Sequence, residues 1–504
     1  MAIIVVGFDA TILNVALSTL STQLDASNDQ LQWIVDSYLL VFAAALLPAG
    51  LLGDRFGRKR LLILGIVIFA VASLVGTVAT TPAALIAARA LMGLGAAVLV
   101  PASMSLIPAL FPPAERTRAV SIWTAVFAAG VPLGPVVGGW LLDHYWWGSI
   151  FLVNIPMLAL ALIAAVTLLP ESLDPTVPRI DLLGVFLSTI GLSALVYGII
   201  EAPVDGWTDA AVLTALGLGV VVLGLFAWWQ SKAATPIMDV DLLRRPSFRW
   251  PAFTATLATL VLFGLLFVVP QYLQVLLEND AFGTGIRLMP LLLGLVAGGV
   301  ATDRLAHRCG HKPIVVVGLF VLAAGCAVGT ATGPSDGYGF TVGWFIPTGI
   351  GLGLAIVPSM DLVLKELPDD EAGRGGGLVM TLRQVGAAFG VAVLGSILSS
   401  IYRGRVHTDT LPPVMADIAR SSVGGAARVA EQFTAAPAKA DLLMASASDA
   451  YLDGMAVTLA VCAISALVGG LLAWWRLPGR RSPVATSTAT EPRGELTASE
   501  DTQS

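Results

Sequence analysis

The chain has few charged residues and almost no cysteine, and each scarcity excludes a class of protein. Charged side chains make up 12% of the 504 residues and apolar ones 56%, whereas about 25% of residues are charged in soluble domains. Three cysteines are too few for a disulfide framework, so Cys309, Cys326 and Cys462 are expected to be packing residues. The net charge of −6 is not gathered in a basic block, which argues against nucleic acid as a partner.

Sequence motifs of several functional classes are also missing. The chain has no phosphate-binding P-loop, so ATP is not expected to drive it. It has no convincing cluster of metal ligands or of nucleophile and base, so we expect no metal, no organic cofactor and no enzymatic activity. A cleavable signal peptide is not expected either, because the first apolar run lacks a basic n-region and leads into more membrane sequence.

Long apolar runs dominate the chain instead. A hydrocarbon core about 30 Å thick requires about 20 apolar residues per helix, and runs of that kind recur along the whole sequence. We therefore predict an all-α integral membrane protein with fourteen transmembrane helices, at residues 2–20, 32–52, 61–80, 83–105, 118–142, 149–169, 180–200, 210–230, 250–273, 286–302, 313–331, 340–362, 376–400 and 454–476.

The distribution of positive charge orients these spans. Lys and Arg in the short connections lie almost entirely on one side, most densely in the segment 50–60, whereas Arg287 is the only basic residue in the short connections of the other side. The side rich in Lys and Arg is the cytoplasmic one. Both termini are therefore predicted to be cytoplasmic.

Three segments fall outside this pattern. Residues 402–453 are predicted to form a long extracellular loop, within which 414–433 forms amphipathic helix against the membrane surface. The tail 477–504, rich in Ser, Thr, Glu and Pro, is predicted to be disordered. Only eight residues precede Asp9, so either the native start lies upstream of Met1 or the first helix is short and shallow.

The chain also repeats itself. The segment 50–59, GLLGDRFGRK, aligns without gaps with 303–312, DRLAHRCGHK. In each half a glycine-rich helix ending in proline follows, and then a small-residue seam, Gly130-x3-Gly134 or Gly386-x3-Gly390. We predict two homologous six-helix bundles, residues 1–170 and 250–476, separated by two inserted helices and a cytoplasmic linker at 171–249. Parallel repeats of this kind enclose a substrate site near the bilayer midplane.

These features resemble the fourteen-helix drug:proton antiporter branch of the major facilitator superfamily. The resemblance covers nearly all of residues 1–476. It rests on five motifs in order: DATILNVAL from Asp9, WIVDSY from Trp33, the segment GLLGDRFGRK, Arg89 with MGLGAA, and Gly130-x3-Gly134-Pro135-x2-Gly138-Gly139. It implies a major facilitator fold in a bacterial cell membrane, with a small-molecule substrate and protons as the coupling ion. We expect a monomer.

The resemblance gives the segment 50–60 the role of a cytoplasmic latch that favours the outward-facing state through charge pairs and a helix-terminus interaction. Its residues are Gly50, Asp54, Arg55, Gly57, Arg58 and Lys59. The alternative is a positive-inside anchor, which requires only basic residues and does not explain Asp54 or Gly57. His307 replaces Asp54 in the second copy, so a latch there is expected to be weaker or sensitive to pH, and degeneration of the repeat is the preferred explanation.

The fifth span has a stripe of small residues that lets a neighbouring helix approach closely. The resemblance makes this stripe a gate between the halves that limits leak, formed by Gly130, Gly134, Pro135, Gly138 and Gly139. The alternative is ordinary helix packing. Both can hold, since a dry close contact is also a seal.

Charged residues inside the bilayer mark the predicted proton pathway, because each is costly unless it is paired or wet. Asp9 lies about 16 Å below the outer boundary by the helical rise per residue. A lone carboxyl near the midplane, facing an aqueous vestibule, can exchange protons near neutral pH, so Asp9 is our proton carrier in preference to a structural cap. Asp36 and Arg89 lie roughly 6–9 Å below the same boundary. They either pair, or Arg89 acts on Asp9 or Asp36 as the coupling residue, a role that the resemblance supports.

The remaining candidates are less sharply defined. Asp361 is interpreted as a cytoplasmic boundary charge, and Arg383, some 10 Å deep by the helical rise, as a partner of Asp361 or of a lipid phosphate; a part of either in transport is left open. A hydrophobic drug surface is assigned to Asn14, Trp123, Phe127, Phe263 and Phe267, with core packing as the alternative for the aromatic residues.

We therefore predict proton-driven export of lipophilic drugs or antibiotics, with a lean towards organic cations because Asp36 in WIVDSY is similar to family members that handle them. A proton from outside neutralises Asp9, directly or through Asp36, and substrate binding from the cytoplasm then releases it inward. Two alternatives stay open: export of an endogenous metabolite such as a secondary metabolite, amino acid or siderophore, and a non-transporting lipid-handling or sensory role.

Overall fold

The computed structural model describes residues 2–169, 181–233, 236, 240–334, 336–365, 372–409, 411–433 and 437–477. All regular structure in these residues is helical, with no strand, so the prediction of an all-α protein is confirmed. A helix lies at each of the predicted spans.

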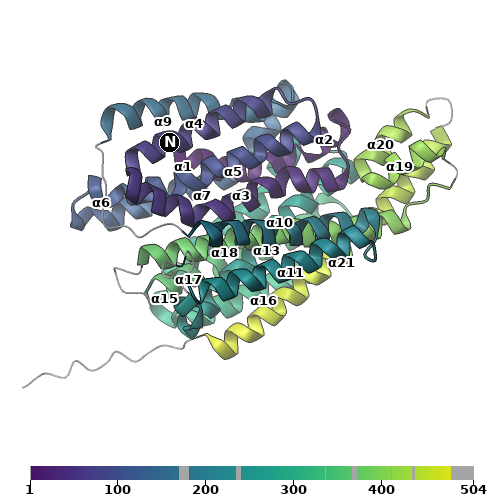
Figure 1. The fold of residues 1–504 in the computed structure, drawn as a ribbon. Coiled ribbons are helices and arrows are strands. Elements are labelled where there is room, and N and C mark those ends of the chain that lie inside the picture. The colour runs from purple at the N-terminus through teal and green to yellow at the C-terminus, as the bar shows by residue number, and fades with distance from the viewer. Residues whose placement is uncertain are drawn as a thin grey trace, which may run out of the picture.

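The first group of helices, which precedes residue 170, is drawn in purple to blue in Figure 1. It consists of α1 (Ala2–Ile12), the 3₁₀-helix η1 (Leu13–Val15), α2 (Leu17–Gln23), α3 (Asn28–Phe56), α4 (Arg58–Thr77), α5 (Pro82–Ser105), α6 (Ile107–Leu110), α7 (Pro113–His144), α8 (Ser149–Leu152) and α9 (Asn154–Leu168).

Two helices, α10 (Leu182–Asp205) and α11 (Ala210–Gln230), lead to a second group. That group consists of α12 (Val240–Arg244), α13 (Pro246–Gln271), the π-helix η2 (Tyr272–Leu276), α14 (Ala281–Arg287), α15 (Met289–Cys309), α16 (His311–Gly329), α17 (Tyr338–Lys365), α18 (Ala372–Arg405), α19 (Pro413–Ser421), α20 (Val423–Glu431) and α21 (Pro437–Arg476).

Eleven helices of the described residues are long and apolar enough to cross a membrane, and a twelfth span results if the bent pair of Ala2–Val15 and Leu17–Gln23, with its 58° bend, counts as one. Helices α3 and α7 lie at the second and fifth predicted spans but are not among these twelve. The structure therefore supports a multi-pass membrane protein, whereas the total of fourteen spans stays a prediction.

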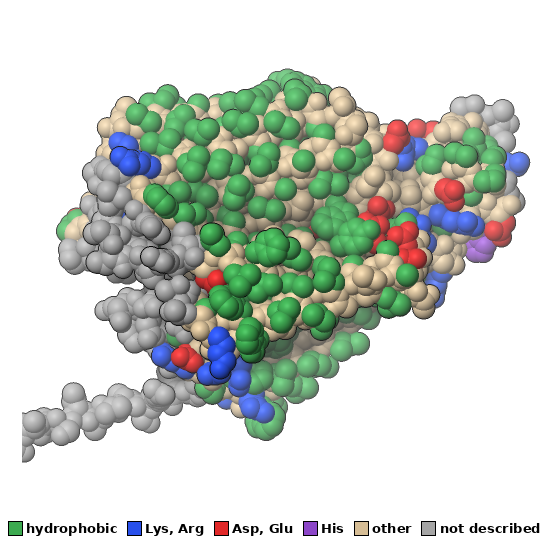
Figure 2. Space-filling model, in the orientation of Figure 1, with side chains coloured by type: hydrophobic (Ala, Val, Ile, Leu, Met, Phe, Trp, Pro, Cys, Tyr) green, Lys and Arg blue, Asp and Glu red, His purple; other side chains and the backbone are tan. Residues whose placement is uncertain are grey.

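The two groups lie side by side with their long helices roughly parallel, and α19 and α20 project beyond one end (Figure 1). Apolar side chains cover the flank of the molecule, and charged side chains gather towards its two ends (Figure 2). The exposed apolar residues of the described chain include Phe186, Leu218 and Val221. A belt of this kind is what a bilayer requires, because the hydrocarbon core solvates apolar side chains and excludes charge.

The predicted repeat has a structural counterpart in the small-residue seams. Gly130 and Gly134 of α7 lie against the backbone of α1, the first helix of the first group. Gly386 and Gly390 of α18 lie in the same way against α13, the first long helix of the second group. Each seam thus joins equivalent helices, and close backbone approach replaces the hydrophobic effect, which does not drive helices together in lipid.

The repeated segments 50–59 and 303–312 also form the same local structure. Gly57 lies between α3 and α4 with a φ of 110°, and Gly310 lies between α15 and α16 with a φ of 82°. Residues with a side chain rarely adopt such angles, which explains why glycine occupies the eighth position of both copies.

A lysine lies two residues after each of these glycines, at the start of the following helix. Its side chain bonds to the end of a different helix. Lys59 Nζ donates to the carbonyl oxygens of Val166 and Leu169 at 2.9 and 2.7 Å, at the end of α9. Lys312 Nζ donates to the carbonyl oxygen of Leu477 at 2.8 Å, just after α21. Carbonyls at a helix C-terminus lack intrahelical partners and carry partial negative charge, so a cation stabilises them.

Replacing Lys59 or Lys312 by glutamine is expected to lower the free energy of unfolding by about 0.3–2 kcal/mol each. The losses should add in the double variant, because the two contacts lie in different groups and share no partner. Thermal unfolding of the purified protein in detergent measures this. Unchanged melting temperatures would mean that both lysines are solvated instead.

The segment 402–453 is more ordered than a loop. Helix α18 continues to Arg405, α19 and α20 cover most of 414–433, and α21 begins at Pro437. The helix predicted for 414–433 is therefore present, as two helices, and these pack on the protein. Tyr402 Oη donates to the carbonyl oxygens of Ala419 and Ser422 at 2.9 and 3.1 Å. The predicted disordered tail lies, from residue 478 on, outside the described residues.

The helices α10 and α11 form a hairpin that one carboxylate closes. Asp181 caps α10 by accepting from the backbone N–H of Gly184 at 2.9 Å. It also accepts from Trp229 Nε1 at 2.9 Å and from Gln230 Nε2 at 2.7 Å, both at the end of α11. The hairpin joins the two groups from outside: Trp33 Nε1 of α3 donates to Glu201 at 3.3 Å, and Ser396 Oγ of α18 donates to the Ile199 carbonyl at 2.6 Å.

Candidate functional site

A buried ion pair lies inside the first group of helices. Arg89 Nη1 on α5 donates to Asp9 Oδ2 on α1 at 2.6 Å, with the two side chains 2% and 0% exposed. Asn154 Nδ2 on α9 donates to the other Asp9 oxygen at 3.3 Å, and to Ser73 Oγ on α4 at 3.4 Å. The ion pair therefore holds four helices together at one point.

Arg89 has further partners on α3. Its Nε donates to the Ile34 carbonyl at 3.2 Å, and its guanidinium carbon lies 4.3 Å from the centre of the Tyr38 ring. A cation over an aromatic face is stabilised, more so when it is removed from water. Arg89 thus has a stabilising environment on α3 that does not depend on Asp9.

This geometry excludes the predicted pair of Arg89 and Asp36, because Arg89 pairs with Asp9, whereas the coupling role of Arg89 stays a prediction. The prediction of a lone carboxyl at Asp9 is wrong for the same reason. Asp9 is completely buried rather than facing an aqueous vestibule in this conformation. Sequence reasoning did not select Asn154 or Tyr38, although an asparagine within the apolar run 149–169 was a signal that could have found the former.

Asp36 is the second buried acid of the first group. Its side chain is 0% exposed, and neither carboxylate oxygen has a hydrogen-bond partner among the described residues. An ionised carboxylate without a partner in that position carries a large desolvation penalty.

The predicted gate residues divide between two contacts. Gly130, Gly134 and Gly138 face α1, where a Cβ atom on Gly130 would lie only 2.7 Å from the Ile4 carbonyl oxygen. Gly139 instead faces α14 of the second group, where a Cβ atom would lie 2.6 Å from Phe282 Cα. The backbone of Pro135 lies against Gly285 of α14. The stripe therefore contacts α1 of the first group on one side and α14 of the second group on the other.

Pro135 also supplies a link to α1. Proline has no N–H, so the carbonyl four residues earlier, that of Val131, has no helical partner. Thr11 Oγ1 of α1 donates to this carbonyl at 2.8 Å. The link lies half a turn beyond Asp9, so a movement of Asp9 reaches α7 through the same helix.

Gly134→Ala is expected to lower the free energy of unfolding by about 1–3 kcal/mol, because the added Cβ would lie 2.7 Å from the Phe8 carbonyl oxygen and 2.8 Å from the Ile12 nitrogen. Gly217→Ala in α11 is the matched control, since nothing lies within 4 Å of its Cβ position. There alanine should stabilise the helix by roughly 0.5–1 kcal/mol. Melting temperatures in detergent measure both, and similar shifts would contradict the close packing of the seam.

The two groups are joined at the end that the charge pattern predicts to be external. Asp143 at the end of α7 accepts from the backbone N–H groups of Ala281 and Phe282 at 3.2 and 3.0 Å, which open α14. Gln274 Nε2 of η2 donates to the Val15 carbonyl at 2.6 Å. Carboxylates near a helix N-terminus are stabilised by the orphan N–H groups and the dipole, so Asp143 caps a helix of the other group.

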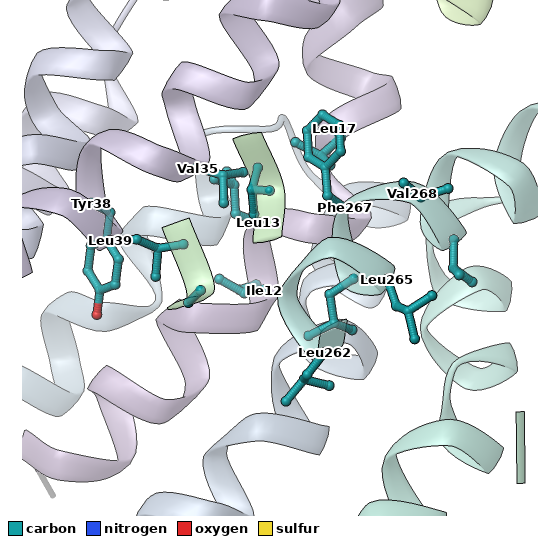
Figure 3. Close-up of a cluster of buried hydrophobic side chains, with 14 of the residues drawn as sticks. Ile12, Leu13, Leu17, Val35, Tyr38, Leu39, Leu262, Leu265, Phe267 and Val268 are labelled. Carbon is teal, nitrogen blue, oxygen red and sulfur yellow. The ribbon is translucent and has the colours of Figure 1, made fainter. Parts of the chain in front are cut away.

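We call the contacts between the two groups at this end, which include those of Asp143 and Gln274, the outer seal. Further contacts of the outer seal involve α2 and α20. Ser21 Oγ lies 3.2 Å from Ser422 Oγ, and Arg428 forms an ion pair with Asp25. Figure 3 shows the apolar part of the same junction, where Leu17 of α2 lies beside Phe267 of α13. Both side chains are 0% exposed. The seal therefore combines polar contacts at the surface with a dry apolar layer beneath.

The five residues assigned to a drug surface make separate contacts in the described structure, and their role in a drug surface stays a prediction. Phe267 belongs to the apolar layer of the seal, and Asn14 is 2% exposed and donates to the Thr11 carbonyl at 3.2 Å. Trp123 and Phe127 stack with their ring centres 6.1 Å apart, and Trp123 Nε1 donates to Ser103 Oγ at 3.0 Å. Phe263 is partly buried against the core.

The predicted cytoplasmic latch is described only in part, because the side chains of Asp54, Arg55 and His307 lie outside the described residues. Arg58 Nη1 donates to the Ser105 carbonyl at 3.0 Å, at the end of α5. This contact and those of Lys59 lie within the first group. Both basic residues thus bond to helix ends, and the latch of the cytoplasmic helix ends that favours the outward-facing state stays a prediction.

Asp361 and Arg383 do not pair. Asp361 Oδ2 lies 3.7 Å from His311 Nε2, whereas Arg383 Nε donates to Thr259 Oγ1 at 3.1 Å. The interpretation of Arg383 as a partner of Asp361 is therefore wrong. Its guanidinium bonds through Nε to α13, and the alternative of a lipid phosphate as its partner stays a prediction.

Two cavities lie near the predicted outer surface of the described residues, and Asp9 lines neither of them. The larger, about 600 Å³, opens at the predicted outer surface between Asp280, Arg287 and Tyr338. The smaller lies under α20 beside Tyr402 and Tyr451. Among the described residues no group of three His, Cys, Asp or Glu side chains could hold a metal ion.

A comparison with known proteins identifies the family to which the chain is similar. A family model described as Major Facilitator Superfamily matches residues 1–391. The multidrug efflux pump LfrA of Mycolicibacterium smegmatis is 33% identical over 469 residues, covering 93% of this chain and 92% of that protein. The tetracenomycin C resistance and export protein of Streptomyces glaucescens is 30% identical over 508 residues, covering 97% and 94%.

Solved structures agree in fold. A bacterial homologue of the human lysosomal transporter Spinster, in an inward-facing and occupied conformation, has a TM-score of 0.63 at 18% identity and covers 94% of this chain and 95% of that one. A peptide transporter, POT, in complex with alafosfalin has a TM-score of 0.60 at 14% identity and covers 94% of each chain.

Proposed function

The chain belongs to the major facilitator superfamily, and we propose that it is a proton-driven antiporter that exports drugs or antibiotics across a bacterial cell membrane. Relatives named as a multidrug efflux pump and as an antibiotic resistance and export protein match it over more than nine-tenths of its length, which supports drug export. A non-transporting role has no comparable support. The chain works as a transporter without catalytic chemistry or a bound cofactor, and as a monomer with both termini in the cytoplasm.

The ion pair of Asp9 and Arg89 is the single observation that carries the proton coupling. While Asp9 is ionised it ties α1 to Arg89 of α5. Protonation removes the charge of the carboxylate and with it most of that attraction. Arg89 keeps the Ile34 carbonyl and the Tyr38 ring as partners, so the cation does not become fully uncompensated. The protonation state of Asp9 therefore determines whether the Asp9–Arg89 ion pair holds α1 to α5.

Movement of α1 reaches the outer seal directly. From Asp9, the same stretch of chain passes Thr11, bonded to α7, and Val15, bonded to η2 of the second group. It then reaches Ser21 beside α20. We infer that loss of the Asp9–Arg89 pair changes the strength of these contacts, in one direction or the other. The free energy of protonating Asp9 is then coupled to the free energy of closing the outer side.

The outer seal supports an inward-facing state for this conformation. In that state the substrate binds from the cytoplasm or the inner leaflet, and the proton leaves inward. Opening of the seal would then release the substrate and expose the carboxylate to the outside, which is alternating access by two rocking bundles of six helices. Asp36, buried with no hydrogen-bond partner among the described residues, is a second group on this route that can hold a proton.

Efflux from everted membrane vesicles tests the function. With an imposed pH gradient, acid inside, vesicles containing the protein should accumulate a lipophilic cation such as ethidium, and dissipating the gradient with a protonophore should stop accumulation. ATP should have no effect beyond the gradient it generates. Accumulation that persists without any gradient would contradict proton coupling.

A further inference from the structure

The second group contains a partly buried cation that no acid of the described residues balances. Arg383 of α18 donates through Nε to Thr259 Oγ1 of α13 at 3.1 Å. No carboxylate of the described residues lies within ion-pairing distance of it, and no described acceptor takes its Nη groups. An uncompensated guanidinium inside the membrane is costly, and residues of this kind usually mark a pathway for substrate or ions.

The contacts of α18 show where its faces point. Gly390 lies against α13, and Gly395 lies against Gln32 of α3. Ser396 donates to a carbonyl of α10. Successive residues of a helix lie about 100° apart around its axis. By this rule, the side of α18 that faces α10 is opposite to the side that faces α13 and α3. That face is therefore turned to the interior between the two groups and away from the hairpin at the periphery.

Arg383 and Gln384 lie on the two edges of this interior face. By the same angular rule, Arg383 is on the side of Gly390, in agreement with its bond to Thr259, and Gln384 is on the side of Gly395. Gln384 is 9% exposed, and its Oε1 atom has no hydrogen-bond partner among the described residues. A buried carbonyl without a donor is unusual. The face thus presents unused donors next to an unused acceptor.

These groups define the chemistry of a ligand. The two Nη groups of an arginine match the two oxygens of a carboxylate, and such pairs are short and strong where water is excluded. Gln384 Oε1 can accept from a hydroxyl or amine beside that carboxylate. Phe263, one turn from Thr259 on α13 and partly buried, offers an apolar surface for the body of the molecule.

We propose that Arg383, with Gln384 beside it, binds the carboxylate or another anionic oxygen of the exported compound, so that the chain carries zwitterionic and anionic amphiphiles as well as cations. The proposal rests on the drug export proposed above and adds a substrate class to it. In the first group Arg89 is already neutralised by Asp9, so of these two arginines Arg383 is the one whose charge is available to a ligand.

A matched pair of ligands tests this with the purified protein in lipid nanodiscs. Ciprofloxacin carries a carboxylate, and its methyl ester lacks only that charge; ethidium is the cationic reference. Arg383→Gln should weaken binding of the acid by about tenfold or more, while binding of the ester and of ethidium changes by less than about twofold. Arg383→Lys should restore part of the loss. Arg405→Gln, in the same helix at the outer end beside Asp453, should change none of the three.

The outcomes separate a binding role from a structural one. Removing a charge that no acid balances should leave the melting temperature unchanged or raise it, whereas a structural arginine would lower it and weaken all three ligands together. A parent protein that binds the acid no better than the ester, or an Arg383→Gln variant that keeps the preference, overturns the proposal. The pH dependence of ethidium efflux in vesicles is measured separately. Its absence would overturn proton coupling without touching the binding result.

Discussion

Asp9→Asn is expected to abolish pH-driven efflux, reducing uptake by everted vesicles to the level of vesicles without the protein. Asparagine keeps the shape of the side chain but can neither release a proton nor attract Arg89 as an ion. Because Asp9 accepts from Arg89 at 2.6 Å and from Asn154 at 3.3 Å, the substitution also leaves the guanidinium without its charged partner. Breaking one side of a buried pair costs about 3–5 kcal/mol, so the melting temperature should fall as well.

A double variant separates the two effects of this substitution. Asp9→Asn with Arg89→Gln removes both charges, so stability should recover towards that of the parent while pH-driven efflux stays absent. Asp449→Asn, which changes an exposed carboxylate of α21, should leave efflux and stability unchanged. Normal pH-driven efflux by either Asp9 variant would exclude Asp9 as the proton carrier and remove the basis of the proposed coupling.

A disulfide across the outer seal is expected to stop transport reversibly. Ser21 and Ser422 belong to α2 and to the N-cap of α20 (Figure 1), and their hydroxyl oxygens lie 3.2 Å apart. Cysteines at both positions should therefore form a bond on oxidation without large backbone movement. Since release of substrate requires the seal to open, the oxidised double variant should lose nearly all efflux, and a reductant should restore it.

Single variants control for the substitutions themselves. Ser21→Cys and Ser422→Cys should each transport normally under oxidation. All variants are made in a background in which Cys309, Cys326 and Cys462 are replaced, so that no other thiol contributes. Full efflux by a double variant whose cross-link is verified by mass spectrometry would show that α2 and α20 stay together throughout the cycle, and that the seal opens elsewhere.

Much of the architecture could be predicted because it depends on properties of single segments. Apolar runs long enough to cross a bilayer indicated where helices lie, since the hydrocarbon core leaves few alternatives to a helix. The alignment of the segments 50–59 and 303–312 predicted equivalent structures, and Gly57 and Gly310 both have positive φ. The spacing of Gly130 and Gly134 predicted a close helix contact, which α1 provides.

The partners of the charged residues could not be predicted in the same way. Arg89 was expected to bond to Asp36 or to act on Asp9, and the lateral packing of α1, α3 and α5 selects Asp9. The depth of each residue followed from the helical rise, but two acids at similar depth on different helices are distinguished only by which helix face meets which neighbour. The same limit applies to Arg383, whose partner proved to be Thr259 and not Asp361.

Local composition thus suffices to identify a membrane-embedded helical protein and the residues too polar for their surroundings, whereas the transporter class came from the resemblance of its motifs to a family. The assembled helices alone decide that Asp9 and Arg89 neutralise each other, that Asp143 caps a helix of the opposite group, and that Arg383 remains unbalanced. The reason is physical. A soluble helix shows its buried face by an apolar stripe, whereas helices in lipid are apolar on all sides, so close packing of small residues and a few buried polar bonds choose the neighbours.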